Sequence, residues 1–351
     1  NGAASPLDGQ TVEIEGIVVG DYDDAGELQG FFVQEEDADV DADSTTSEGI
    51  FVFVGSASSV NVSEGDHVRV VGVVDEFFGQ TQLDDIVELE IISSGNSALV
   101  TPTNISLPTV TGSYEDEATY EAFEGMSVTF TGTLVVSEFF ELGRYGQILL
   151  TVDEVPTQFA QTNTPDVTGY QQYLDLLGRS QIILDDANNT QNFPISLGGN
   201  FAYPYPNPGL SLTNFFRGGD SIDGLTGVLS WSWAGLTGTD AWRIRPIEAE
   251  DYSFTPENIR TPTPDDVGGT LKVASFNVLN FFTTIDDGTN DARGANSAAE
   301  LERQTDKLVA ALAEIDADIV GLTEIENDFD FDGGTALEAL VDALNAEMGA
   351  G

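Results

Sequence analysis

The sequence predicts a mixed protein, in which two small all-β barrels are followed by an α/β unit. Three observations support this fold class. Short strand-like segments fill residues 11–92 with turn residues between them, and the first of these, 11–19, alternates polar and apolar residues. Similar segments return less regularly between residues 125 and 246, and a Pro-, Thr- and Gly-rich stretch at 255–270 reads as a linker. Beyond it the pattern becomes strand, helix, strand, helix. We therefore expect domains at 1–95, 96–254 and 271–351.

Five strands are expected in the first module, at residues 11–19, 30–34, 49–54, 66–74 and 80–92. Glycines at the bends favour a small closed or partly open barrel. The second module repeats this pattern imperfectly, because 125–136 resembles the first strand and 219–229 resembles the fourth. Its last strand is expected at 242–246, and a long insertion is expected at about 153–215. We interpret the two segments as copies of one β-module.

The third region begins with an apolar strand at 271–279, and a second strand follows at 319–324. Ser297 with Glu300, and Thr335 with Glu338, have the spacing of capping boxes, so a helix is expected after each pair. Strand, helix and strand in this order indicate neighbouring strands of one sheet.

Two polar residues mark the ends of these strands. Asn277 lies near the end of the first strand and Glu324 ends the second. Ligands of α/β sheets gather at the carboxyl ends of strands, so this pair is the candidate catalytic site. The alternative is that Asn277 caps a turn and that Glu324 is simply solvated.

Charge is the dominant feature of the composition. The chain has 61 acidic and 11 basic residues, a net charge of -50. Self-repulsion of this size destabilises a compact chain unless salt screens it, which indicates adaptation to a salty medium. The alternative is an acidic tail or a region that binds calcium ions through many acidic side chains, but the acidic residues are spread through patterned segments. Cysteine is absent, so a bound metal would have carboxylate and amide ligands, which suit Mg²⁺, Mn²⁺ or Ca²⁺.

Several residues are candidates for contact with other molecules. Exposed aromatic rings of a small barrel can stack on nucleic-acid bases, although core packing is the alternative. Arg243 and Arg245 beside Trp242 are the best candidates for a nucleic-acid contact. His67 lies in an apolar-alternating strand and is expected to be structural. The carboxylates at 37, 39, 41 and 43 suggest either a cation contact or a solvated loop, and those at 328, 330 and 332 begin an EF-hand pattern that fails at Ala339.

Particular motifs resemble a known superfamily. The runs 275–280 (Ser-Phe-Asn-Val-Leu-Asn) and 318–327 (Asp-Ile-Val-Gly-Leu-Thr-Glu-Ile-Glu-Asn) resemble the opening motifs of the endonuclease/exonuclease/phosphatase superfamily, to which DNase I belongs. Together with 293–296, 302–304 and Lys307, they resemble extracellular bacterial endonucleases of the ExeM/NucH type. The runs 30–37 and 48–53 resemble the OB-like (YhcR-type) module of that family. The resemblance is good over 1–95 and 271–351, and looser between them.

This resemblance implies two OB-like barrels before the N-terminal part of a DNase I-like α/β sandwich. It implies that Glu324 binds the divalent metal and that Asn277 helps to hold the scissile phosphate. Glu326, Asn280, Arg293 and Arg303 match family motifs without an assigned role, and the two arginines are candidate nucleic-acid contacts. The family's late Asp-plus-Asn and Ser-Asp-His motifs are absent, which implies a fragment that is inactive by itself.

We therefore expect a secreted, extracellular, metal-dependent phosphodiesterase that acts on DNA and, as an alternative, on RNA. The metal is expected to be Mg²⁺ or Mn²⁺, with Ca²⁺ as the alternative. The sequence contains no run of 18 or more apolar residues, so no membrane span is predicted. The start at Asn1 is expected to reflect a removed signal peptide or a trimmed chain. A phosphatase or lipid phosphodiesterase of the same superfamily is the second hypothesis, and a non-catalytic, acidic cell-surface or matrix-binding module is the third. The oligomeric state is not predicted.

Overall fold

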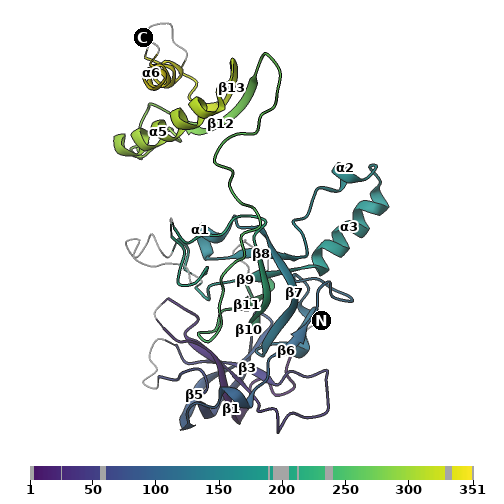
Figure 1. The fold of residues 1–351 in the computed structure, drawn as a ribbon. Coiled ribbons are helices and arrows are strands. Elements are labelled where there is room, and N and C mark those ends of the chain that lie inside the picture. Colours follow the sequence, from purple (N-terminus) through teal and green to yellow (C-terminus); the bar gives the residue numbers. More distant parts are fainter. Residues whose placement is uncertain are drawn as a thin grey trace. The chain divides into compact units, whose positions relative to one another are not determined.

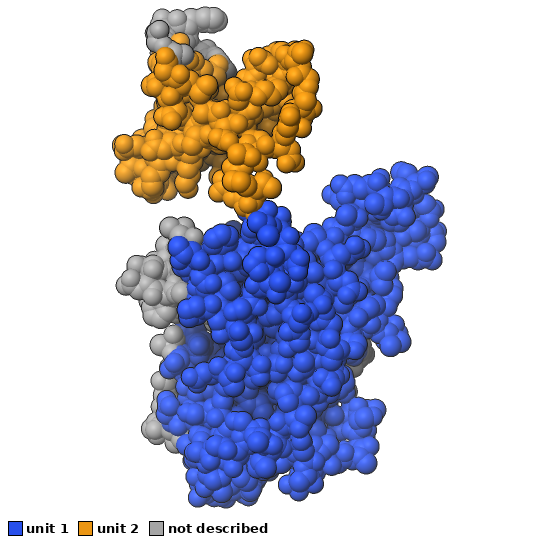
Figure 2. Space-filling model, in the orientation of Figure 1, with its two compact units in different colours: residues 1–259 blue, residues 260–351 orange. Residues whose placement is uncertain are grey.

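The computed structural model describes residues 4–24, 26–55, 61–188, 190–192, 205–211, 213–233, 240–328 and 334–349. The chain divides into two compact units, residues 1–259 and 260–351, and the division falls within the stretch expected to be a linker (Figure 2). In coarse terms the fold is the expected one, a mixed and mostly β protein that contains a closed five-stranded barrel (Figure 1).

The first barrel closes in the order β1-β2-β3-β5-β4. Its strands are β1 (Thr11–Tyr22), β2 (Gly30–Gln34), β3 (Gly49–Phe53), β4 (His67–Phe77) and β5 (Gln80–Ser93). Alternation of buried and partly exposed residues along β4 shows why it forms, because one face must fill the barrel while the other meets water. Val18, Phe31, Val52, Val70 and Leu83 are among the core residues.

The second module is a six-stranded sheet that closes through an additional β10–β7 pairing. Its strands are β6 (Thr103–Ile105), β7 (Ser127–Glu138), β8 (Ile148–Val152), β9 (Gln181–Leu184), β10 (Ser221–Trp233) and β11 (Asp240–Arg245). Within it, β7, β8, β9, β11 and β10 form a ring. Strand β1 pairs antiparallel with β2 and β4, and β3 pairs parallel with β5. In the same way, β7 pairs antiparallel with β8 and β10, and β9 pairs parallel with β11. The two modules therefore share one topology, which is the repeat expected from the sequence.

The expectation of a single insertion at 153–215 was wrong. Strand β9 lies inside that range, and all four of its residues are buried. Four residues are too few to show a period of two, so the strand could not be distinguished from a loop. The segment before it contains the short helix α2 (Phe159–Thr162) and helix α3 (Val167–Arg179), and another short helix, α1 (Leu142–Tyr145), precedes β8. Three 3-10 turns, η2 (Ser97–Leu99), η3 (Glu117–Thr119) and η4 (Glu121–Phe123), connect the modules.

An apolar cluster joins the two modules into one unit. Tyr22 and Phe32 of the first module are buried in it with Val228 of the second. The Tyr22 hydroxyl donates a hydrogen bond to the Pro246 carbonyl oxygen at 2.9 Å, which ties the first barrel to the chain beyond β11. Burial of these large side chains stabilises the contact, since each contributes about 1.5–3 kcal/mol relative to an exposed position.

The second unit is a strand-helix-strand-helix segment. It consists of β12 (Val273–Phe281), α5 (Ala298–Ile315), β13 (Ile319–Ile325) and α6 (Ala336–Met348). Strands β12 and β13 are parallel, and Val278, Phe281, Leu308 and Leu340 are buried between strands and helices. The Thr335–Glu338 capping box is complete, as predicted. At Ser297 only half of it forms, because the Glu300 carboxylate accepts instead from the Asn296 N–H.

Candidate functional site

Asn277 lies in the middle of β12, at the last regular pair with β13, and Glu324 is the next-to-last residue of β13, so the two lie at about the same level of the small sheet. Asn277 pairs in register with Thr323, the residue directly before Glu324. Both Asn277 and Glu324 are exposed. Because Phe276 and Val278 pack toward the helices, Asn277 lies on the other side of its strand.

A left-handed residue in β13 turns Glu324 away from the apolar side. Strict alternation would place Glu324 on the same face as Leu322, which packs against the core. Glu324 instead has φ +62°, so Thr323 and Glu324 are both exposed and Ile325 returns to the core. Such a conformation is uncommon outside glycine and costs about 1–3 kcal/mol.

The end of β12 is irregular at the matching level. Leu279 and Asn280 have φ +53° and +52°, and the pairing register shifts between Asn277 and Phe281. Three left-handed non-glycine residues therefore lie at the ends of two paired strands. Backbone strain of this kind gathers at ligand-binding and catalytic positions, because only a surrounding structure that over-determines it can hold it.

Neighbouring side chains fix this geometry, and the sequence patterns did not assign them. Gln304 of α5 donates from Nε2 to the carbonyl oxygens of Val278 and Leu279, at 3.1 and 2.8 Å. Glu326 accepts at Oε2 from Thr283 N (2.8 Å), Thr283 Oγ1 (3.1 Å) and Thr284 N (3.1 Å). Burial acts to raise the pKa of Glu326, but these hydrogen bonds outweigh it and lower the pKa. Glu326 is therefore an ionised carboxylate whose hydrogen bonds hold the loop after β12 in place.

The available chemical groups are an amide and a carboxylate. Asn277 Oδ1 accepts from Leu279 N at 2.8 Å, as a turn-capping residue would, and this leaves its amide nitrogen as a donor. Among the described residues no group of three or more His, Asp or Glu side chains is arranged to hold a metal ion. Glu324 fits a hard cation that keeps most of its ligands as water and phosphate oxygens, which is how Mg²⁺ is commonly bound.

The two arginines of the second unit are accessible. Arg293 is exposed in the loop before α5. The Arg303 side chain is 64% exposed, and its Nη2 lies 3.9 Å from Glu300 Oε1, which is a weak surface pair. Both therefore remain candidates for contact with a phosphate backbone.

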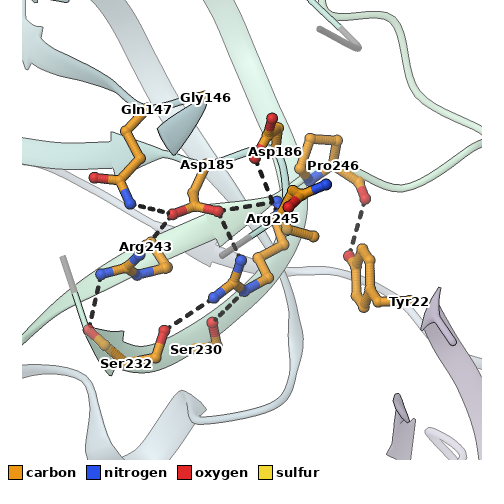
Figure 3. A network of polar contacts seen from close by, with 12 residues as sticks. Tyr22, Gly146, Gln147, Asp185, Asp186, Ser230, Ser232, Arg243, Arg245 and Pro246 are labelled. Atoms are coloured by element: carbon orange, nitrogen blue, oxygen red, sulfur yellow. Dashed lines mark hydrogen bonds and ion pairs between the residues drawn. The ribbon is translucent and has the colours of Figure 1, made fainter. Parts of the chain in front are cut away.

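The structure contradicts the expectation that Arg243, Arg245 and Trp242 contact nucleic acid, because all three are at most 1% exposed. Figure 3 shows the reason, a network centred on Asp185. Asp185 Oδ2 lies 2.5 Å from Arg243 Nη1, and Oδ1 lies 2.7 Å from Arg245 Nη1. Burial acts to raise the pKa of Asp185, but the charges of Arg245 and Arg243 outweigh it and hold the pKa below its usual value. Burial lowers the pKa of Arg243 to about 10.

The aromatic residues separate into two groups. Tyr205, Trp231 and Trp242 are buried, which is the core-packing alternative. Phe77, Phe78, Phe139 and Phe140 are exposed by 55%, 76%, 49% and 74%. Phe77 and Phe78 also line a cavity of about 480 Å³ with Leu28, Phe51 and Phe53. Tyr203 and the side chain of Trp233 lie outside the described residues.

The remaining candidate side chains have local structural partners. His67 Nε2 lies 3.0 Å from Glu15 Oε1 and 3.3 Å from Glu36 Oε1, within the first module. Asp37 accepts from Thr101 N and Oγ1, so the acidic loop is anchored to the chain after β5. Asp328 Oδ2 accepts from Ala336 N at the start of α6, while Asp330, Asp332 and Gly333 lie outside the described residues.

Comparison of the chain with protein-family models, with curated proteins and with solved structures finds no match. No helix among the described residues has the length and apolar character that crossing a membrane requires.

Proposed function

We propose that this chain is part of a secreted, metal-dependent phosphodiesterase that hydrolyses nucleic acid. The carrying observation is the exposed amide and carboxylate of Asn277 and Glu324, which lie where the regular pairing of two parallel strands stops and left-handed residues begin. We further propose that the second unit belongs to a DNase I-like sandwich and that both barrels are OB folds. The strand order shared by the two rings supports the OB assignment.

The chemistry of phosphodiester hydrolysis explains the residue types. A divalent metal such as Mg²⁺ or Mn²⁺, when bound, neutralises charge on the phosphate and the leaving oxygen. Glu324 would hold that ion through its carboxylate, and the Asn277 amide nitrogen would donate to a phosphate oxygen. Gln304 and Glu326 keep the two strand ends in place, because each binds backbone groups beside them. Small displacements of such groups are costly to catalysis, so this support matters.

The cavity that contains Phe77 and Phe78 is the proposed nucleic-acid contact of the first unit. Their exposed rings offer stacking surfaces, and stacking contributes about 1–3 kcal/mol per base. Stacking needs no basic side chain, which suits a chain whose net charge of -50 repels phosphate. Salt screens that repulsion, so activity is expected to increase at high ionic strength.

Metal binding can be tested on this chain with Mn²⁺ as a paramagnetic NMR probe. Low concentrations should broaden the signals of Glu324 and the Asn277 side-chain amide first. Glu324→Gln should abolish this selective broadening, whereas Glu314→Gln, an exposed change at the far end of α5, should leave it intact. Broadening centred elsewhere, or unaffected by Glu324→Gln, would remove Glu324 from the site.

Catalysis is tested in the full-length gene product with plasmid DNA as substrate. Cleavage should require divalent metal and stop in EDTA, and Glu324→Ala should abolish it while the far-UV circular dichroism stays unchanged. Cleavage that continues in EDTA contradicts the mechanism. Turnover of a phosphomonoester or a phospholipid in place of DNA would instead identify the second hypothesis.

A further inference from the structure

A cavity of about 740 Å³ lies in the first unit, between the first barrel and the turn that precedes β7. Among the described residues, its wall includes aliphatic side chains of Ile14, Val33 and Ile50 and no Lys, Arg or His side chain. Six carboxylate side chains share it: Glu13, Glu15, Glu35, Glu48, Glu121 and Glu124. So many acids around one concave space repel one another unless some of them are protonated or a cation enters.

The Glu124 carboxylate faces this cavity with one oxygen that lacks a hydrogen-bond donor among the described residues. Glu124 is 6% exposed, and its Oε1 has no hydrogen-bond partner among the described residues. Its Oε2 accepts from Thr81 N, at 3.3 Å. Glu121 Oε2 is likewise buried without a hydrogen-bond partner in the part of the chain that the structure describes. A buried acceptor without a donor costs about 1–3 kcal/mol, and more when it is charged.

The backbone holds Glu124 in position, so its side chain cannot escape by a shift of the loop. Ser47 Oγ donates to the Glu124 carbonyl oxygen at 2.5 Å. Directly after it, Gly125 meets Gly49 so closely that a Cβ on Gly49 would lie 2.4 Å from the Gly125 carbonyl carbon. Ser127 N also donates to Gln34 Oε1 across the same contact, at 2.8 Å. These contacts therefore fix the position of Glu124 in the cavity wall.

The arrangement of the acids selects the shape of the cation. Among the described residues no three carboxylates are placed to share one metal ion. They are instead distributed around a space much larger than an ion, with aliphatic surface between them. Ammonium groups that are separated by methylene chains match this pattern, because each can meet a carboxylate while the chain covers apolar surface.

We propose that this cavity is a binding site for a linear aliphatic polyamine, with Glu124 and Glu48 among the groups that receive its ammonium ends. The raised pKa values of Glu124 and Glu48, which favour their protonated forms, agree with this proposal. Burial and the charge of Glu121 raise the pKa of Glu124 to about 8 against one backbone hydrogen bond. Burial, followed by the hydrogen bond and charge of Glu35, raises the pKa of Glu48 to about 7. An entering ammonium group lowers both values, so binding near neutral pH releases protons.

The test is calorimetric titration of the chain with spermidine at about 0.15 M salt, where the Debye length is about 8 Å. Binding should saturate at one site and release protons, which is measured by repeating it in two buffers of different ionisation enthalpy. Loss of one charge-assisted contact in Glu124→Gln or Glu48→Gln should weaken binding about tenfold or more. Glu154→Gln, at an exposed turn outside the cavity, should leave the affinity unchanged.

Folding does not confound this comparison. The glutamine oxygen of Glu124→Gln can still accept from Thr81 N, and thermal melts at pH 8 should show no loss of stability. Three results would overturn the proposal: non-saturating binding that Glu154→Gln weakens equally, Ca²⁺ that binds the cavity in preference to spermidine, and a lysine-rich peptide that binds where spermidine does not. The cavity and its test are independent of the proposed hydrolysis.

Discussion

Asp185→Asn should be among the most destabilising single substitutions in the first unit. Asp185 is 1% exposed and forms ion pairs with two guanidinium groups that are themselves at most 1% exposed. It also accepts from Gln147 Nε2 at 2.8 Å and from Ala187 N at 2.9 Å. Removing one partner of a buried ion pair costs about 3–5 kcal/mol. Since Asp185 serves both Arg243 and Arg245, we expect a loss of about 4–5 kcal/mol.

That loss is large beside a total stability of about 5–15 kcal/mol and should lower the thermal midpoint by roughly 10 °C. Urea unfolding followed by tryptophan fluorescence reports it, because Trp231 and Trp242 lie in the same module with ring centroids 5.5 Å apart. The matched control is Asp175→Asn, whose 67%-exposed carboxylate pairs with Arg179 at the surface. It should cost about 0–1 kcal/mol.

Equal effects of Asp185→Asn and Asp175→Asn would refute the reasoning, because the buried ion pairs of Asp185 would then contribute no more than a surface pair. The pH dependence offers a second check. The folded pKa of Asp185 is lowered below its unfolded value, so its contribution is present above about pH 4 and is lost as pH falls through the folded pKa. Acid unfolding of the wild-type protein should therefore begin below about pH 4. Asp185→Asn should lack the part of this acid-induced loss of stability that protonation of Asp185 causes.

Three further predictions concern protons, salt and backbone packing. Burial raises the folded pKa of Glu27 to about 7 and of Glu124 to about 8. The native chain then binds more protons than the unfolded chain, so the free energy of unfolding should fall from pH 5 to pH 8, with a shallower slope in Glu124→Gln; a rise over that interval contradicts it. Raising KCl to about 1 M should increase the thermal midpoint by screening a charge of -50, whereas an equal response to sucrose would point to osmotic effects. Gly49→Ala should cost about 1–3 kcal/mol in urea unfolding because of its contact with Gly125. Gly143→Ala, with open space around the added methyl, should change stability by less than about 0.5 kcal/mol.

The fold was predictable where local chemistry repeats. Strand-like segments bounded by turn residues identified β4 and β5 almost to their ends, and the capping pair Thr335–Glu338 marked the start of α6. Strand β9 was missed because four buried residues carry no period. Its place in the ring depends on a parallel pairing with β11, far along the chain. Long-range pairing leaves little trace in either segment alone.

The candidate site was predictable only in part. The apolar run that stops at a polar residue correctly placed Glu324 near the end of its strand, whereas β12 continues beyond Asn277 to Phe281. The left-handed turn at Glu324, which exposes its carboxylate, has no local signature such as glycine. The supporting roles of Gln304 and Glu326 also depend on backbone groups supplied by a neighbouring element.

The sequence by itself determined the β-rich modules, the change of pattern after residue 270, the acidic charge and the pair of polar strand ends. These features arise from periodicity, turn residues and composition, which act over a few neighbours. Tertiary structure alone decided that Arg243 and Arg245 are core residues, and that Glu124 and Glu48 share a cavity. A charged residue reads the same in sequence whether it faces solvent or a buried partner. Only the folded chain brings Asp185 to the two arginines and removes water from all three.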